Sequence, residues 1–87
     1  MTRTAILLVS ERRDLLGVGE RLVLEFRGEW AAGAVFAEVA LCRAALIRAG
    51  VRAGLAAATE AMARGRLVRH ADAAQELASV LARRERN

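Results

Sequence analysis

Apolar residues recur along this chain at steps of three and four, the spacing that places side chains on one face of an α-helix. The first such series predicts a helix from an N-cap at Ser10 to about Arg27, followed by a left-handed glycine at Gly28. Gly17 and Gly19 lie inside this helix, where we expect them to allow close packing. The inward positions of the first helix are Leu15, Val18, Leu22, Val23 and Phe26.

A second helix is predicted from Trp30 to Ala49, ending at Gly50, and a third from Ala53 to Arg69. The inward positions of the second helix are Val35, Val39, Cys42 and Leu46, and those of the third are Leu55, Ala58, Met62 and Leu67. Cys42 lies on the apolar face of its helix and is expected to be a small core residue. Two seams of very small residues indicate tight helix packing; they are Gly33, Ala37, Ala40 and Ala44, and Gly54, Ala58, Ala61 and Gly65.

Beyond the third helix, Asp72 with Gln75 three residues later is typical of a capping box. It predicts a short fourth helix over about residues 72–84, with Ala74, Leu77, Ala78 and Leu81 on one face. At the other end, Ala5 to Val9 form a short apolar series that periodicity alone cannot separate from a buried strand. Because the chain offers no second strand, we interpret residues 5–9 as an extension of the first helix or as a hydrophobic arm.

The predicted fold is therefore all-α: a small bundle of three main helices plus a short C-terminal helix. We expect one domain over residues 1–87, with an N-terminal apolar arm at 1–10 and a core bundle at about 11–69.

Composition adds a reason to expect association. The chain is 55% apolar but only 3% aromatic, and a chain this short buries only about 60 to 65% of its unfolded surface. Alanine accounts for part of the apolar fraction, and exposed alanine does not by itself make a surface prone to association. Several large side chains nevertheless fall away from the predicted core stripes. The expected contact residues of a homodimer are Leu15, Leu24, Trp30, Phe36, Leu41 and Ile47.

The positive charge lies mainly in the second half of the chain. All 14 basic residues are arginine, which fits the coding bias of a GC-rich genome, and the formal net charge is +4. Such asymmetry indicates an anionic partner, for which Arg64, Arg66 and Arg69 are the expected binding residues. The alternative is a solvated helix end, where cations offset the helix dipole.

No residue pattern predicts catalysis or a bound cofactor. The acidic residues are scattered among arginines, whereas acid–base catalysis needs titratable groups in one cleft. One histidine, His70, and one cysteine cannot complete a closed zinc site. The longest uncharged stretch, 30–37, is much shorter than the roughly 20 residues of a membrane span. We therefore expect a non-catalytic protein with no metal or cofactor, located in the cytoplasm and away from membranes.

Two regulatory alternatives remain. A turn at 51–54 between two helices resembles a helix-turn-helix, but the early turns of the following helix carry Ala56, Ala57, Thr59 and Glu60, which include no Arg, Asn or Gln to hydrogen-bond base edges. Nucleic acid is therefore not favoured as the partner. Residues 65–84, a basic linker before an amphipathic helix, resemble the partner-binding tail of an antitoxin, in which case the partner is another protein.

Residues 11–67 also resemble a known family. The resemblance rests on Glu20-Arg21-Leu22, Phe26-Arg27-Gly28, Val35 with Val39, Leu46, and Met62-Ala63-Arg64 with Leu67. This pattern is similar to the actinobacterial three-helix-bundle dimerization domain, which occurs alone or fused to arsenate-reductase or low-molecular-weight phosphatase-like proteins. The resemblance implies self-association without phosphatase chemistry. The chain departs from the family at Trp30, where Pro or Ser often opens the second helix, and at its two ends.

Overall fold

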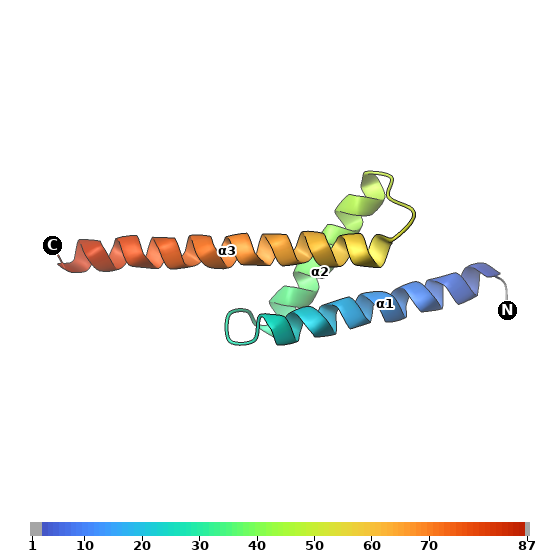
Figure 1. Cartoon of the computed structure of the whole chain (residues 1–87), viewed down its shortest axis with the longest axis horizontal. Coiled ribbons are helices and arrows are strands. Elements are labelled where there is room, and N and C mark those ends of the chain that lie inside the picture. The colour runs from blue at the N-terminus through green and yellow to red at the C-terminus, as the bar shows by residue number, and fades with distance from the viewer. Residues whose placement is uncertain (1–2, 87) are drawn as a thin grey trace.

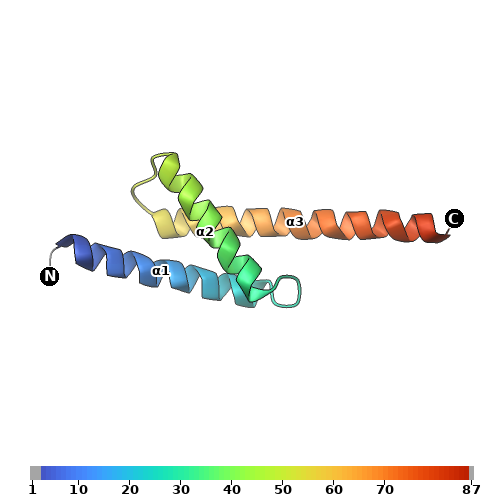
Figure 2. The same ribbon diagram turned by 180° about the vertical axis from the view of Figure 1, so that it is seen from behind.

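The computed structural model describes residues 3–86, with side chains from Ser10 onward. Its helices are α1 (Arg3–Glu25), α2 (Ala32–Arg48) and α3 (Leu55–Arg86), and residues 3–86 contain no strand. The all-α prediction is confirmed. Helices α1 and α3 lie side by side, and α2 crosses behind both of them (Figure 1). Seen from the opposite side, α2 lies in front, so its far side is turned away from both other helices (Figure 2).

Helix α1 begins earlier than predicted. Its backbone is helical from Arg3, so Ser10 lies inside α1 and the prediction of an N-cap there is wrong. The backbone of residues 5–9 is the helical extension, one of the two interpretations left open; the first two residues of the expected arm lie outside the described part. Alanine and leucine are strong helix formers, and no proline or glycine interrupts the chain before Gly17.

Glycines end α1 and α2 as predicted. Gly28 has φ +89° and Gly50 has φ +91°, a left-handed conformation that costs glycine little. After α2, the Val51 amide donates to the Leu46 carbonyl at 3.0 Å and the Gly50 amide to the Ile47 carbonyl at 3.0 Å. These bonds satisfy carbonyls that the end of a helix leaves without partners.

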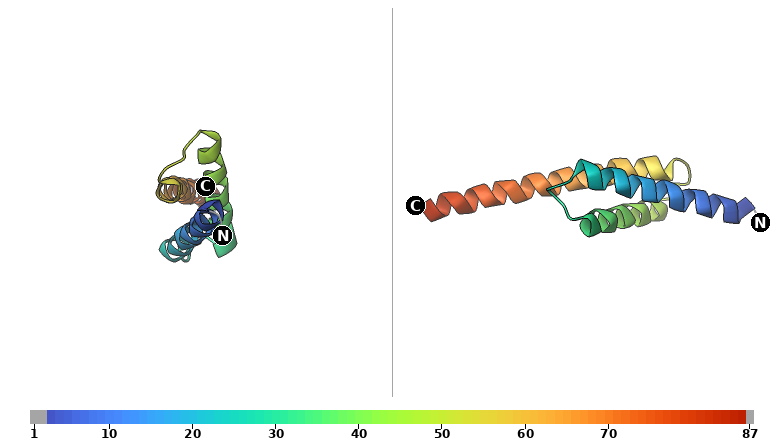
Figure 3. Two further views of the ribbon diagram at one scale, coloured as in Figure 1. Left: turned by 90° about the vertical axis from the view of Figure 1, so that its right-hand side faces the viewer. Right: turned by 90° about the horizontal axis from the view of Figure 1, so that it is seen from below.

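The predicted fourth helix is absent as a separate element, because α3 continues unbroken from Leu55 to Arg86. Asp72 and Gln75 therefore lie inside a helix and form no capping box. The sequence from Arg66 to Arg86 contains no glycine or proline, and the Ala, Leu, Arg, Glu and Gln residues there favour continuation. The second half of α3 projects beyond the other two helices (Figure 3).

The core lies where the three helices meet. It confirms most of the predicted positions in α1 and α2, with Leu15, Val23 and Leu46 only half-buried. In α3 the structure confirms Leu67 as buried, whereas Leu55 and Ala58 are half-buried and Met62 is exposed. The fully buried positions that the pattern missed are Thr59 and Ala63. Thr59 lies at the centre of the buried face, and a pattern based on apolar residues does not include a threonine. The buried apolar residues are Val18, Leu22, Phe26, Val35, Val39, Cys42, Ala63 and Leu67.

Close packing between α1 and α2 depends on Gly19. The Phe36 ring lies against it, so that a Cβ at Gly19 would overlap the ring, which confirms the expected use of this glycine. The two seams of small residues do not serve the same purpose inside the protein. Gly33, Ala37 and Ala40 are exposed on α2, and Gly54 and Ala61 are exposed near the start of α3.

Candidate interaction surface

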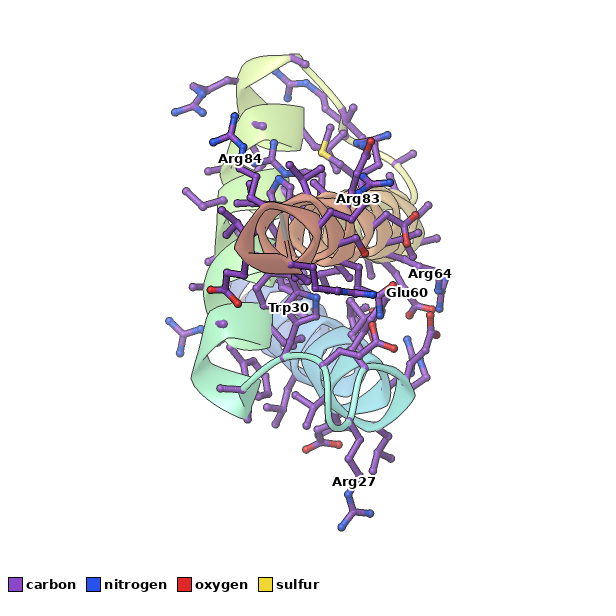
Figure 4. All side chains as sticks on the ribbon, turned by 90° about the vertical axis from the view of Figure 1, so that its left-hand side faces the viewer. Arg27, Trp30, Glu60, Arg64, Arg83 and Arg84 are labelled. Atoms are coloured by element: carbon purple, nitrogen blue, oxygen red, sulfur yellow. The ribbon has the colours of Figure 1, made fainter. Side chains whose placement is uncertain are left out.

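Ion pairs between the helices hold many of the charged side chains. Arg21 Nε donates to Glu60 Oε1 at 3.0 Å, and Arg64 Nε donates to Glu25 Oε2 at 2.9 Å. Both pairs join α1 to α3 over the same sequence separation of 39 residues, which means that the two helices run in the same direction. The Arg64 and Glu60 side chains point into the space between these helices (Figure 4).

The charged residues in the middle of α2 also point inward. Arg43 Nε donates to Glu11 Oε1 on α1 at 2.8 Å, and Arg66 Nε on α3 donates to Glu38 Oε1. Of the three charged residues in α2, only Arg48, in its last turn, has no ion-pair partner among the side chains that the structure describes. These pairs therefore leave the opposite side of α2 without charge over most of its length.

That opposite side, which we call the outer face of α2, is apolar and accessible. Leu41 is 59% exposed, Ile47 44% and Phe36 38%. The residues between them are small and form the seam noted in the sequence. The outer face consists of Gly33, Ala37, Ala40, Leu41, Ala44 and Ile47, with Phe36, whose ring packs on Gly19 of α1, at its edge. Since exposed apolar area on a small protein is favourably removed from water, this face is the candidate interaction surface.

Of the six contact residues predicted from the sequence, four are exposed and two pack against the core. Leu41 and Ile47 are exposed on the outer face of α2, and Phe36 is partly exposed at its edge, with its ring against Gly19 of α1. Leu24 is the most exposed large apolar residue among the described side chains, and it lies on α1. Leu15 and Trp30 instead pack against the core.

Trp30 closes the end of the bundle. Its indole Nε1 donates to the Leu67 carbonyl at 3.3 Å, and its ring meets that of His70 edge to face, with centroids 6.4 Å apart. Both contacts anchor the loop between α1 and α2 against α3 (Figure 4). Trp30 therefore has a structural role in the single chain.

The arginines expected to bind an anion do not converge. Arg64 hydrogen-bonds Glu25 and Glu60, whereas Arg66 is paired with Glu38 on α2. Two of the three guanidinium groups are thus turned toward different helices and already have carboxylate partners. Arg69 remains exposed. The geometry favours helix packing over an anion site at these residues.

Cys42 is buried among apolar side chains. Burial raises the pKa of its thiol, and the nearby Glu38 carboxylate, which accepts from Cys42 Sγ at 3.8 Å, raises it further against the opposing effect of Arg66. A protonated, inaccessible thiol is a poor nucleophile. Among the described side chains, no group of His, Cys, Asp and Glu is arranged to hold a metal ion.

Several exposed apolar residues were not predicted from the sequence. Leu16, Met62, Val68, Leu77 and Leu81 are all at least one-third exposed. Leu77 and Leu81 belong to the apolar face predicted for the fourth helix. No described helix is long and apolar enough to span a membrane.

No protein-family model matches this chain, and neither a curated protein nor a solved structure matches it.

Proposed function

We propose that this chain is a non-catalytic, cytoplasmic self-association module that forms a homodimer through the outer face of α2. The observation that carries the proposal is the absence of charge on this face from Gly33 to Ile47, because Glu38 and Arg43 are engaged in ion pairs on the other side of the helix. A helix face that meets only water normally carries charged and polar residues.

The surface area of the whole chain supports the proposal. The chain exposes 6607 Å², whereas a compact monomer of 9.4 kDa exposes about 5,000 Å². The excess of about 1,600 Å² is larger than the roughly 800 Å² that each partner contributes to a standard protein–protein interface. A second copy can therefore cover surface that this fold cannot bury alone.

Membership of the actinobacterial three-helix-bundle dimerization domain, which the residues resemble, would give the chain the same role. Nucleic-acid binding is the weaker candidate, because Arg64 and Arg66 face carboxylates of their own chain. Phosphate contacts need guanidinium groups that are free to reach the nucleic-acid backbone.

The test is Leu41→Glu, which places a carboxylate in the middle of the outer face. We expect this variant to be monomeric by sedimentation at concentrations where the wild type is dimeric, because a buried carboxylate without a partner is costly. The matched control is Val68→Glu on α3, which is 43% exposed and should leave the dimer intact.

A Leu41→Glu protein that stays dimeric would overturn the assignment of this face. Circular dichroism of both variants shows whether they keep the helical fold. Binding to random DNA that disappears at high salt would favour the nucleic-acid alternative instead.

A further inference from the structure

The last turns of α3 project away from the rest of the chain. We call residues 71–86 the α3 extension; at 1.5 Å per residue it is about 24 Å long. Only its first turn lies near other elements, where Ala71, Ala74 and Gln75 line a hollow with residues 28–30. Beyond this hollow the helix continues into solvent (Figure 1).

The α3 extension carries an apolar stripe without a partner in its own chain. Ala74, Leu77 and Leu81 continue, at steps of three and four, the face that Ala63 and Leu67 present to the core. Leu77 is 60% exposed and Leu81 49%. Because isolated helices of this length are marginally stable in water, a contact that covers the stripe would also stabilise the helix.

The α3 extension is about as long as the outer face of α2, and the side chains of the two surfaces differ in size. The outer face of α2 spans residues 33–47, about 22 Å at the α-helical rise. Its middle is lined by Gly33, Ala37, Ala40 and Ala44, which leave room for a neighbouring helix to come close. The α3 extension presents the larger Leu77, Val80 and Leu81, which would fill that room.

Charges at the ends of the two faces favour one orientation of the α3 extension relative to α2. An acidic residue, Glu29, precedes α2, and Arg48 and Arg52 lie at its other end. The α3 extension has acidic residues in its first half and mainly arginines at its end. These residues are Asp72 and Glu76, then Arg83, Arg84, Glu85 and Arg86. An antiparallel pair brings opposite charges together at both ends and opposes the helix dipoles, whereas a parallel pair would place like charges side by side.

We infer that the dimer forms by reciprocal exchange, in which the α3 extension of each copy lies antiparallel on the outer face of α2 of the other copy. This inference rests on the proposed function, since it names the surface that covers the outer face. Within one chain the α3 extension points away from α2 (Figure 3), so only a second copy can supply it. A twofold axis then produces the contact twice, which accounts for the large excess of exposed surface.

The test mixes two complementary variants. Leu41→Glu damages the outer face of α2 and leaves the α3 extension intact, whereas Leu77→Glu/Leu81→Glu does the reverse. In reciprocal exchange each variant alone is monomeric, because both contacts of its homodimer are damaged. A one-to-one mixture regains a heterodimer through its one intact contact. Because the second contact is lost, we expect a dissociation constant at least tenfold higher than that of the wild-type dimer, without loss of binding. Sedimentation with one chain fluorescently labelled measures this.

The control for added charge is Gln75→Glu/Ser79→Glu, on another side of the α3 extension, which should remain dimeric. A dimeric Leu77→Glu/Leu81→Glu protein beside a monomeric Leu41→Glu protein would overturn the exchange and keep the outer face of α2 as the interface. A dimeric Leu41→Glu protein beside a monomeric Leu77→Glu/Leu81→Glu protein would show that the outer face of α2 is not the interface. A mixture that stays monomeric would also overturn the exchange, and a monomeric wild type would refute the proposed function together with this inference.

Discussion

At the scale of single residues, the glycines illustrate what the sequence can and cannot predict. The turn glycines Gly28 and Gly50 could be located from the sequence, because each follows a helical series and a left-handed residue is common there. The partner of Gly19 could not be predicted, since the Phe36 ring belongs to another helix. Thr59 is a similar case: its hydroxyl is buried without a hydrogen-bond partner among the described residues, which no local pattern indicates.

Gly19 and Gly65 give a matched test of helix packing. Gly19→Ala should lower the free energy of unfolding, because the cost of displacing the Phe36 ring, about 1–3 kcal/mol, exceeds the gain in helix propensity of up to about 1 kcal/mol. Gly65→Ala should raise it by about 0.5–1 kcal/mol, since the nearest atom to a Cβ there is Arg69 Nη1 at 4.0 Å. Urea unfolding measures both changes. Stabilisation by both substitutions would show that Phe36 does not pack on Gly19.

At the scale of elements, the number and type of the main helices followed from periodicity, whereas their limits and contacts did not. The start of α1 and the continuation of α3 were wrong because Ser10 and Asp72 are good caps by residue type, yet their neighbours favour helix more strongly. The ion pairs that orient α2 were not predicted, because they join residues 28 and 32 positions apart. The outer face of α2 follows from these pairs, so the candidate site could be identified only in part.

The contact between α1 and α3 should depend on pH. Hydrogen bonds from Arg21 hold the pKa of the Glu60 carboxyl below its ordinary value, with Arg64 acting in the same direction and partial burial opposing both. The stability that Glu60 contributes is therefore fully present above its unfolded pKa of about 4.5. It is lost as the pH falls through the lowered pKa of the folded protein.

Glu60→Gln should thus reduce the free energy of unfolding at pH 7 by about 0.5–1 kcal/mol, since the pairs are near the surface. The difference from wild type should shrink as the pH falls below 4.5, because wild type then loses the charge as well. Urea unfolding at a fixed protein concentration and a series of pH values measures it, with Glu20→Gln on α1, an exposed position outside the described ion pairs, as the control. A difference that stays constant down to pH 2 would contradict the role of these ion pairs.

The α3 extension should be ordered by association. In the Leu41→Glu variant we expect the amides of residues 78–85 to exchange with solvent almost as fast as in an unstructured peptide, because a helix end without tertiary contacts opens readily. In the wild-type dimer the same amides should be protected at least tenfold more. Hydrogen exchange followed by mass spectrometry distinguishes the two states. Equal exchange in both proteins would mean that the dimer interface does not include these residues.

At the scale of the whole molecule, the shape explains why a single chain leaves so much surface uncovered. The chain measures 66 × 25 × 14 Å and has a radius of gyration of 16.7 Å, compared with about 12 Å for a compact domain of this length. The sequence indicated a surplus of apolar residues, and Leu24, Leu41 and Ile47 are indeed exposed. It did not indicate that Leu77 and Leu81 add to this surplus, because residues 72–84 were expected to form a separate short helix and not the projecting end of α3.

Sedimentation equilibrium of the unmodified chain, over a concentration series and at low and high salt, measures directly whether two copies associate. We expect a mass close to twice the 9.4 kDa of one chain at both salt levels, since burial of the apolar outer face of α2 depends little on screening. A mass of a single chain at every concentration would show that the chain does not self-associate.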